Sequence, residues 1–331
     1  NFEKAIKTLG QNIKKDTLVI IETTIPPGTT EKIIYPSLLK EFKKRFAKDI
    51  KPKLAHSYER VMPGPEYLSS IINFWRVYSG IDKESEISCK KFLSTIINTK
   101  KYPLQKLSSC NASELSKVLE NSYRAINIAF IEEWGIFAEN IGVNLFEVLN
   151  AIKIRPTHSN IRKPGLGVGG YCLTKDPLMG YVSKNQFFKE YIGEFPMTKT
   201  AIEINKLMPF HTYEITNKYI RECKLNKKIL ILGLSYRDQV GDIRNSASID
   251  LAKHFLQNNY SINSHDPLIK EKISSDLGYL KNLPKAELFS AIVLTVSHDF
   301  YKEFNIISWL KNFKGLFIDA NNILSEDIIQ K

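Results

Sequence analysis

The chain has 331 residues, which is long enough for two or three domains that each bury a hydrophobic core. Hydrophobic residues make up 43% of it and charged residues 25%, as in an ordinary globular protein. No apolar run approaches the ~18 residues that a membrane-spanning helix needs, and the N-terminus has no signal-peptide pattern. We therefore expect a cytoplasmic protein without a membrane partner.

Cysteine usage and charge narrow the classes further. The four cysteines are widely separated and show no CxxC or CxxH spacing, so we expect reduced thiols, no disulfide framework and no metal site. The formal net charge is +12, which also occurs in nucleic-acid-binding proteins, but the lysines are scattered and form no basic block interleaved with aromatic residues. This distribution favours a solvated basic surface, suited to small anionic substrates, over a nucleic-acid partner.

The first hundred residues alternate between predicted helices and strands, the pattern of an α/β sheet. Helical spacing begins at Phe2, so the chain, which has no initiating Met, is expected to start inside a domain. Ligands bind at the carboxyl ends of strands in such folds, where Thr24 lies, although a threonine there is by default only a cap. Glu59 and Arg60 follow the next strand and are by default a solvated pair. The predicted helices are 2–13, 30–47 and 83–98. The predicted strands are 16–24, 75–81 and 101–104, and residues 53–64 are predicted as a further strand that enters a loop.

One long helix is predicted from Asn111, with Glu114 three residues later as in a capping box, to Gly142. At 1.5 Å per residue its roughly 30 residues span about 45 Å, a length typical of a helix that links domains or forms a dimer interface. An apolar stripe runs along it with i, i+3, i+4 spacing. Lys117 and Asn121 are four residues apart and share one face, which is either a solvated stripe or a pair of donors facing a ligand.

A glycine-rich segment from Pro164 to Pro177 contains the candidate nucleophile. Its four glycines come directly before Cys172, and glycine is used where the backbone turns through positive φ or approaches a ligand closely. Taken alone, Cys172 is more often a small buried hydrophobe than a catalyst. Asp176 follows it by four residues.

A second α/β unit follows a boundary at residues 223–226. Its predicted strands are 227–236, 260–267, 290–298 and 314–322, with a helix at 248–257 after the first of them. Strands of this kind joined by helices imply a parallel, doubly wound sheet. The predicted fold class is α/β, with two Rossmann-like doubly wound domains joined by a helical domain that contains the long central helix. The expected boundaries are 1–104, 105–222 and 223–331.

Six segments, in order, resemble the UDP-glucose/GDP-mannose dehydrogenase family of nucleotide-sugar 6-dehydrogenases. They are TTIPPGTT, SYERVMPG, ELSKVLENSYRAINIAF, PGLGVGGYCLTKDP, ILGLSYRDQVGDIRNS and SHDP. One such motif is weakly specific, whereas six in the family's order extend the resemblance from end to end. ERVMPG and GVGGYC look most like enzymes that act on UDP-N-acetylhexosamines, such as UDP-N-acetylmannosamine dehydrogenase. The resemblance implies an oxidoreductase of polysaccharide biosynthesis that converts a sugar C6 alcohol to a carboxylate and reduces two NAD+ per sugar.

The resemblance implies that Cys172 is a nucleophile. Its thiolate adds to the C6 aldehyde, and the thiohemiacetal is oxidised to a thioester that water hydrolyses. Lys117 and Asn121 match residues whose donors surround the C6 oxygen, as an oxyanion site requires, and Lys117 is also a candidate base for the alcohol proton. Asp176 matches an aspartate that positions a lysine and a water.

The resemblance also implies NAD as the cofactor and a UDP-sugar as the substrate. Glu59 and Thr24 match residues that hold the hydrolytic water or line the nicotinamide side. Arg244 matches an arginine that reaches the substrate of a neighbouring subunit, so a homodimer is implied, with the long helix as its expected interface. The expected substrate-binding residues are Gly167, Gly169, Gly170, Tyr171, Arg244 and Arg60, and the expected cofactor-binding residues are Thr24, Glu59, Lys175 and Arg237.

Three departures from the family pattern bear on these expectations. The GxGxxG fingerprint is absent from the 331 residues, so the chain is expected to begin about three strands into its first Rossmann-like domain and to bind NAD poorly as given. Tyr171 stands where many relatives have His or Ser, and Arg237 where many have lysine, which bears on the identity of the sugar and the nucleotide. Two alternatives stay open: the same chemistry on UDP-glucose or GDP-mannose, or a nucleotide-sugar-binding fragment without catalysis.

Overall fold

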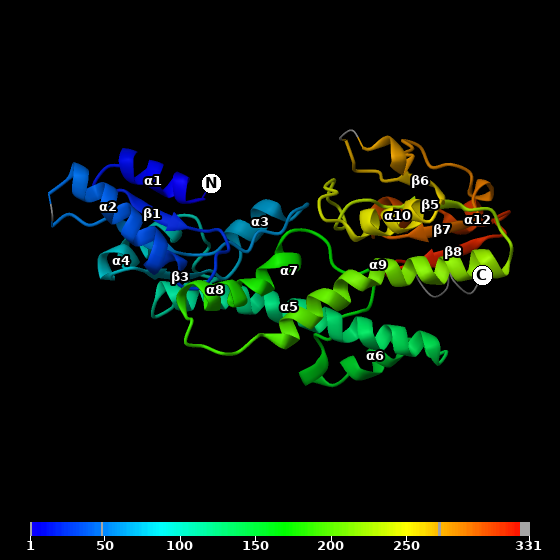
Figure 1. The fold of residues 1–331 in the computed structure, drawn as a ribbon, viewed down its shortest axis with the longest axis horizontal. Helices are drawn as coiled ribbons and strands as arrows, with labels where there is room; N and C mark the ends of the chain where they lie inside the picture. Colours follow the sequence, from blue (N-terminus) through cyan, green and yellow to red (C-terminus); the bar gives the residue numbers. More distant parts are fainter. Residues whose placement is uncertain (1, 48, 271–272, 325–331) are drawn as a thin grey trace. The chain divides into compact units, whose positions relative to one another are not determined.

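The computed structural model describes residues 2–47, 49–270 and 273–324, which form two compact units (Figure 1). The first unit comprises the residues up to Tyr123 together with Lys175–Pro196, and the second comprises Arg124–Thr174 together with the residues from Met197 onward. Each unit contains a four-stranded sheet with helices packed against it, which confirms the predicted α/β class. The three domain boundaries expected from the sequence stay a prediction. In the part of the chain described, no helix is long and apolar enough to cross a membrane.

The first unit has the strand order β1-β2-β3-β4. Its elements are α1 (Phe2–Asn12), β1 (Leu18–Ile21), η1 (Thr30–Ile34), α2 (Tyr35–Arg45), β2 (Lys53–His56), α3 (Tyr67–Ile72), β3 (Val77–Gly80), α4 (Lys83–Leu93), β4 (Gln105–Lys106), η3 (Asp176–Leu178) and α8 (Met179–Phe187). Val19 and Ile21 of β1 face a core shared with α1 and α2, whereas Leu18 and Ile20 pack on the other side with α4. A continuous apolar run suits β1 because both of its faces are covered. β2 pairs in parallel with β1 but antiparallel with β3, so this sheet is mixed.

Two local predictions in this region are wrong. The strand expected at 101–104 lies at Gln105–Lys106, where Gln105 pairs in parallel with Val77. The apolar character of the preceding residues comes from packing and not from strand pairing, because Leu104 packs against the core cluster beside α4. The long helix begins one residue before Asn111, and its cap is Ser109, whose Oγ accepts the Ala112 N–H at 3.1 Å.

The second unit has the strand order β6-β5-β7-β8, and all three strand pairs are parallel, as predicted for a doubly wound sheet. The boundaries between the two units fall inside three helices, α5 (Cys110–Asn140), α7 (Cys172–Lys175) and α9 (Pro196–Glu222). The other elements of the second unit are α6 (Leu145–Lys153), η2 (Pro156–His158), β5 (Lys228–Leu232), α10 (Ala247–Gln257), β6 (Ser261–His265), η4 (Ser275–Leu277), η5 (Ala286–Leu288), β7 (Ala291–Leu294), α11 (Asp299–Glu303), α12 (Ile306–Leu310) and β8 (Leu316–Asp319).

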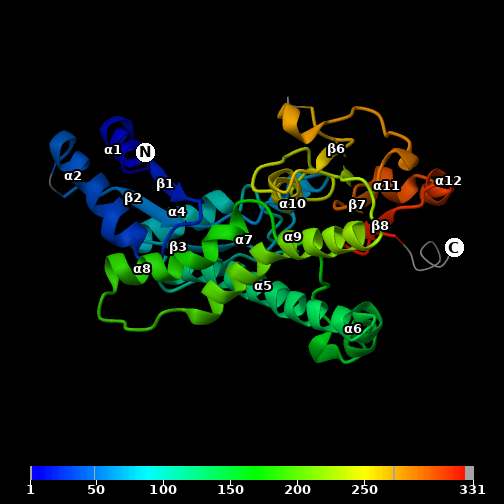
Figure 2. The same ribbon diagram turned by 45° about the vertical axis from the view of Figure 1, so that its right-hand side comes forward.

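Helices cover both faces of this second sheet (Figure 2). Ile229 and Ile231 of β5 enter a core with α9 and α10, while Leu230 and Leu232 enter a core with α11 and α12. β5 pairs in parallel with β7 on one side and with β6 on the other, so the carboxyl ends of β5 and β7 lie side by side. This is the point at which the strand order reverses, where open α/β sheets bind their ligands.

The apolar stripe expected along α5 is largely solvent-exposed. Trp134 is 47% exposed and Phe137 53%, and the two rings contact each other edge to face at 5.9 Å. A face of this kind is typical of an interaction surface. The dimer interface expected on this helix stays a prediction. The exposed apolar residues of the helix are Leu115, Leu119, Tyr123, Phe130, Trp134 and Phe137.

Candidate catalytic and nucleotide-binding sites

Lys117 and Asn121 project from the same face of α5 into the interior of the first unit. Each is only 8% exposed, so the interpretation of this face as a solvated stripe is wrong. Lys117 Nζ donates to the Glu59 carbonyl oxygen at 3.1 Å and lies 5.3 Å from the centre of the Tyr58 ring. Asn121 Nδ2 donates to Asp176 Oδ2 at 2.9 Å. The helix therefore presents the Lys117 amino group and the Asn121 amide group one turn apart, each held by a fixed partner.

Asp176 is the buried acceptor of this cluster. It lies at the start of η3, is 1% exposed, and accepts from Lys175 Nζ through Oδ1 at 2.6 Å as well as from Asn121 through Oδ2. A buried carboxyl group needs such hydrogen-bond partners to offset the cost of its removal from water. The structure thus brings together three of the expected residues, with Asp176 orienting the Asn121 amide and the Lys175 ammonium.

Glu59 and Arg60 are anchored to the same unit and are not a solvated pair. The Glu59 carboxylate accepts the backbone N–H of Val61, so its contact with Lys117 is made through its main-chain carbonyl. Arg60 Nη2 pairs with Glu120 Oε2 of α5 at 2.9 Å. Both residues therefore hold the loop after β2 against the long helix.

The loop after β1 is held by Glu114, which the sequence suggested only as part of a capping box. Its carboxylate accepts the N–H of Gly28 at 2.6 Å and of Thr30 at 2.8 Å. Burial raises the pKa of Glu114 to about 7, although these hydrogen bonds oppose the rise. The N–H groups that start η1 are thus taken by the chain's own carboxylate and do not fit a cofactor phosphate. Thr24 lies three residues after β1 and is partly exposed, and its contact with the nicotinamide side of NAD stays a prediction.

The glycine loop and Cys172 belong to the second unit. Cys172 begins α7 and is exposed, so the interpretation as a small buried hydrophobe is wrong. Gly167 has φ +101°, and a Cβ there would lie 2.4 Å from the Asn205 carbonyl oxygen. Gly170 has φ +80°, and a Cβ there would lie 2.9 Å from the Tyr236 ring. Both positions need glycine for its conformation and for the close approach of neighbours.

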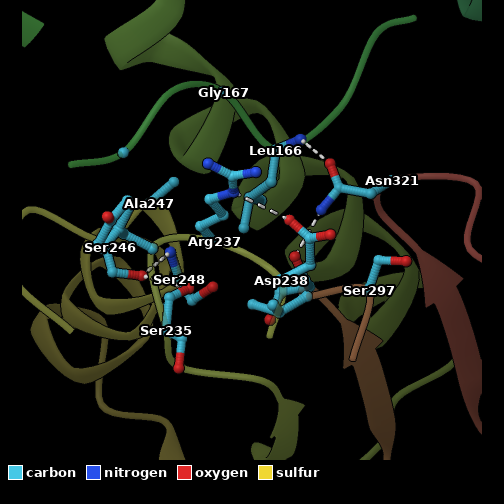
Figure 3. Close-up of a pocket in the computed structure, with 14 residues that line it drawn as sticks. Leu166, Gly167, Ser235, Arg237, Asp238, Ser246, Ala247, Ser248, Ser297 and Asn321 are labelled. Carbon is cyan, nitrogen blue, oxygen red and sulfur yellow. Dashed lines mark hydrogen bonds and ion pairs between the residues drawn. The ribbon is translucent and has the colours of Figure 1, made fainter. Parts of the chain in front are cut away.

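A polar pocket of about 250 Å³ opens at the carboxyl ends of β5, β7 and β8 (Figure 3). The glycine loop forms one wall, and the start of α10 forms another. Ser246 caps α10 by accepting the Ser248 N–H, so the N-terminus of this helix faces the pocket, where it favours an anion. The lining residues are Leu166, Gly167, Gly169, Ser235, Tyr236, Arg237, Asp238, Ser246, Ala247, Ser248, Thr295, Val296, Ser297 and Asn321.

Asp266 holds the pocket segment that follows β5. Its Oδ2 accepts from Leu234 N at 2.8 Å, from Ser235 N at 3.0 Å and from the Ser235 hydroxyl at 2.9 Å. Burial disfavours its charge, but the hydrogen bond from His298 and the backbone donors outweigh that effect and lower its pKa to about 2. An acidic residue at the end of the second strand holds ribose hydroxyls in dinucleotide sites. Asp266 occupies that place but is buried and engaged with the loop.

His298 supports Asp266 from the other side. Its Nδ1 accepts the Gln239 N–H at 3.1 Å, so the ring proton is on Nε2, which lies 3.2 Å from Asp266 Oδ2. His298 thus contacts Gln239 at one end of the segment from Leu234 to Gln239, and it supports the other end through Asp266.

Of the expected basic residues of this unit, Arg237 lines the pocket and Arg244 is not among its lining residues. Arg237 lines the pocket and pairs with Asp238, whose Oδ1 is 3.5 Å from its Nε. Arg244 is exposed, pairs with Asp242 at 2.6 Å and lies 5.2 Å from the centre of the Tyr171 ring. The structure therefore joins Tyr171 of the cysteine loop to Arg244, while the role of Arg244 toward a neighbouring subunit stays a prediction.

Several site residues were not singled out from the sequence. The SHDP motif contained Asp266, but only the fold shows that its carboxylate serves the loop after β5. Glu132 of α5 accepts the Gly165 N–H at 3.0 Å, and Asn321 after β8 accepts the Leu166 N–H at 3.0 Å. Glu132 has no sequence signal beyond a buried position on a helix. Asn321 follows a predicted strand, where a polar residue at the carboxyl end is the available hint.

The switch-point pocket, the glycine loop and the exposed thiol define a nucleotide-binding α/β protein with a candidate cysteine nucleophile. Family models match nearly the whole chain: the NAD binding domain of the UDP-glucose/GDP-mannose dehydrogenase family at residues 1–97, its central domain at 111–207 and its UDP binding domain at 230–326. The chain belongs to this family of NAD-dependent nucleotide-sugar dehydrogenases, which confirms the resemblance found in the sequence.

Individual relatives span the chain from end to end. The UDP-N-acetyl-D-mannosamine dehydrogenase of Methanocaldococcus jannaschii is 33% identical over 338 aligned residues, which cover 100% of this chain and 72% of the relative. The solved UDP-D-ManNAc dehydrogenase of Pyrococcus horikoshii is 27% identical with a TM-score of 0.81, covering 98% of this chain and 73% of that one. The NDP-N-acetyl-D-galactosaminuronic acid dehydrogenase of Methanosarcina mazei Go1 is 26% identical with a TM-score of 0.84, covering 100% and 71%.

Proposed function

We propose that the protein oxidises the C6 alcohol of a UDP-N-acetylhexosamine, with UDP-N-acetylmannosamine as the first candidate, to the uronic acid. One observation carries the proposal: a wall of the polar pocket is the glycine loop that leads directly into Tyr171 and Cys172. A nucleotide in this pocket lies against the segment that bears the nucleophile. The choice of sugar is supported by the relatives named above, two of which are UDP-N-acetylmannosamine dehydrogenases.

The pocket is suited to the nucleoside diphosphate part of the substrate. The N-terminus of α10 carries a partial positive charge, which favours phosphate oxygens at this end of the pocket. Arg237 also lines the pocket, where its charge is balanced by the ion pair with Asp238. Gly167 and Gly169 expose their backbone to the ligand without side chains in between. Ser297 contributes a hydroxyl to the lining, in keeping with a ribose or a base as the neighbouring group.

Cys172 is the proposed nucleophile. The first oxidation removes a hydride from C6 and a proton from its hydroxyl, for which Lys117 is the proposed base, while the Asn121 amide stabilises the C6 oxygen. NAD, when bound, supplies the acceptor for the hydride in both oxidations. The Cys172 thiolate adds to the aldehyde carbon, and loss of a second hydride from the thiohemiacetal leaves a thioester. Water then breaks the C–S bond, which releases the carboxylate and restores the thiol.

The remaining residues of the first unit support these groups. Asp176 holds the Asn121 amide and the Lys175 ammonium, so it is proposed to fix their orientation toward the sugar and the water. Glu59 is proposed to hold the hydrolytic water, and Thr24 to meet the nicotinamide side of NAD. Arg60, anchored to Glu120, is a proposed substrate contact in the same unit as Glu59.

The proposed assembly is a homodimer. The exposed apolar face of α5 supports it, because a face with several half-exposed aromatic side chains is stabilised by covering it. Arg244 is the proposed contact with the partner's substrate, since its side chain is exposed, pairs with Asp242 and lies over the Tyr171 ring. The proposed domains are 1–104 for NAD, 105–222 for dimerisation and catalysis, and 223–331 for the nucleotide sugar.

A substrate panel tests the proposed reaction. NADH formation is measured at 340 nm with UDP-N-acetylmannosamine, UDP-N-acetylglucosamine, UDP-glucose and GDP-mannose, each with NAD. The proposal expects the highest kcat/KM with a UDP-N-acetylhexosamine. A preference for UDP-glucose or GDP-mannose would contradict the assignment of the sugar, and binding of the sugar nucleotide without any NADH would favour a binding protein over an enzyme.

A further inference from the structure

The start of the glycine loop is held at successive residues by groups from different elements. Glu132 of α5 takes the N–H of Gly165 at 3.0 Å, and Asn321 takes the N–H of Leu166 at 3.0 Å. At Gly167, the backbone lies so close to Asn205 of α9 that a Cβ would be 2.4 Å from its carbonyl oxygen. Three consecutive residues are therefore fixed by three separate neighbours.

Asn321 joins the loop to the sheet through both atoms of its amide group. Oδ1 accepts from the Leu166 backbone, and Nδ2 donates to the Thr295 carbonyl oxygen at the end of β7. A donor on one side and an acceptor on the other fix which way the amide faces. The fit is close, since a Cβ at Gly165 would lie 2.2 Å from Asn321 Oδ1.

Asn321 differs from the other two anchors because it lines the pocket itself. Figure 3 shows its side chain beside Leu166, and both residues belong to the pocket lining together with Thr295. Glu132 and Asn205 are not among the lining residues. The hydrogen bonds of Asn321 therefore connect the loop wall of the pocket with the wall formed by the ends of β7 and β8.

We propose that Asn321 is a positioning residue that couples nucleotide binding to the loop leading to Cys172. It holds the loop in the conformation that completes the pocket, so a nucleoside diphosphate in the pocket and the ordered loop favour each other. The inference rests on the proposed function in one respect, that this pocket takes the nucleotide part of the substrate. By linkage, the apparent Kd equals the intrinsic Kd divided by the fraction of the protein whose loop is ordered, so a change that lowers this fraction weakens the apparent affinity by the same factor.

The test uses UDP alone as the probe and needs no turnover. Hydrogen–deuterium exchange is followed in peptides that cover 160–172, and the Kd of UDP is measured by calorimetry, for the wild type and Asn321→Ala. In the wild type, UDP slows exchange in the loop. In Asn321→Ala without UDP, exchange at the loop becomes about fivefold faster, as expected for the loss of one hydrogen bond, and the Kd rises by up to about fivefold, the limit reached when the loop of the variant is mostly open. A residue that only contacted the ligand would raise the Kd without changing exchange in the ligand-free loop.

Two further variants sharpen the result. Asn312→Ala removes the same amide from an exposed position of the second unit that does not line the pocket, and it should change neither quantity. Gly165→Ala disturbs the same contact from the loop side, because the added Cβ would lie 2.2 Å from Asn321 Oδ1 and displace it. It should change exchange and Kd in the same direction as Asn321→Ala, and it replaces Asn321→Ala as the test if Asn321→Ala folds poorly.

Each outcome decides the proposal. Folded Asn321→Ala or Gly165→Ala with wild-type loop exchange and wild-type Kd would overturn it. UDP binding by the wild type without any slowing of loop exchange would also overturn the coupling while leaving the nucleotide pocket in place. No binding of UDP by the wild type would overturn both the coupling and the proposed nucleotide site.

Discussion

Glu132, which accepts the Gly165 N–H of the glycine loop, should make the stability of the protein depend on pH, and Glu132→Gln should remove this dependence. Burial raises the pKa of Glu132 from 4.5 to about 8, the Gly165 N–H partly opposes the rise, and Glu139 adds to it. Between these two pH values the carboxyl group is protonated in the folded protein but ionised in the unfolded chain. The contribution of the protonated Glu132 to the free energy of unfolding is therefore complete below pH 4.5 and is lost as the pH rises through 8.

The size of the effect follows from that difference. Each unit of pH between 4.5 and 8 lowers the free energy of unfolding of the wild type by about 1.4 kcal/mol relative to a variant that does not titrate, so the full range amounts to roughly 5 kcal/mol at most. Gln keeps an acceptor for the Gly165 N–H and resembles the protonated acid in shape, so Glu132→Gln should match the wild type best at low pH.

Thermal unfolding from pH 5 to pH 8, followed by circular dichroism, measures this difference. The Tm of Glu132→Gln should rise relative to that of the wild type by roughly 3–6 °C for each pH unit. This range follows because about 1 kcal/mol of stability shifts the Tm of a domain of this size by about 2–4 °C. The exposed neighbour Glu133 offers a matched control, and Glu133→Gln should show a Tm difference that does not change with pH. A Tm difference between Glu132→Gln and the wild type that stays constant from pH 5 to pH 8 would contradict the raised pKa of Glu132 in the folded protein.

Two further substitutions test the pocket walls. Asp266→Asn removes a buried carboxylate that holds Leu234, so chemical unfolding should show a loss of about 3 kcal/mol at neutral pH. Because the pKa of Asp266 lies at about 2 instead of 3.8, its contribution is present above pH 3.8 and is lost as the pH falls toward 2, so the stability penalty of Asp266→Asn should shrink over that range. Gly170→Ala adds a Cβ 2.9 Å from the Tyr236 ring at φ +80° and should weaken UDP binding severalfold in a titration. Gly142→Ala is its control, with φ +70° and open space around the Cβ, so it should leave UDP binding unchanged; equal effects of the two glycine variants would contradict the steric argument.

The sheets could be predicted from the sequence because their signals are local. The run from Ile229 to Leu232 is apolar without alternation, and the structure buries it on both faces as a central parallel strand. Thr24 after β1 could likewise be placed at a strand end from local signals. Cys172 could be named from its glycines and from the family motif, and its exposure is compatible with that interpretation.

The sequence predicted least where contacts between residues far apart in the chain determine the partner of a side chain or a strand. Glu114 was expected to help start α5, yet its carboxylate serves a loop 84 to 86 residues earlier in the chain. Asn321 contacts Leu166 across 155 residues, and no local pattern indicates such a partner. β4 was misplaced because Gln105 and Lys106 are exposed and carry no apolar signal, so their pairing with β3 depends on the fold.

The central claim is that the protein carries out a four-electron oxidation through Cys172. Its most direct test is the number of NADH molecules and of uronate molecules formed from each molecule of UDP-N-acetylmannosamine, by the wild type and by Cys172→Ala. The wild type should form two NADH and one uronate per sugar, and the variant should form no carboxylate because it has no thiol to form the thioester. Full four-electron turnover by Cys172→Ala would contradict the covalent mechanism.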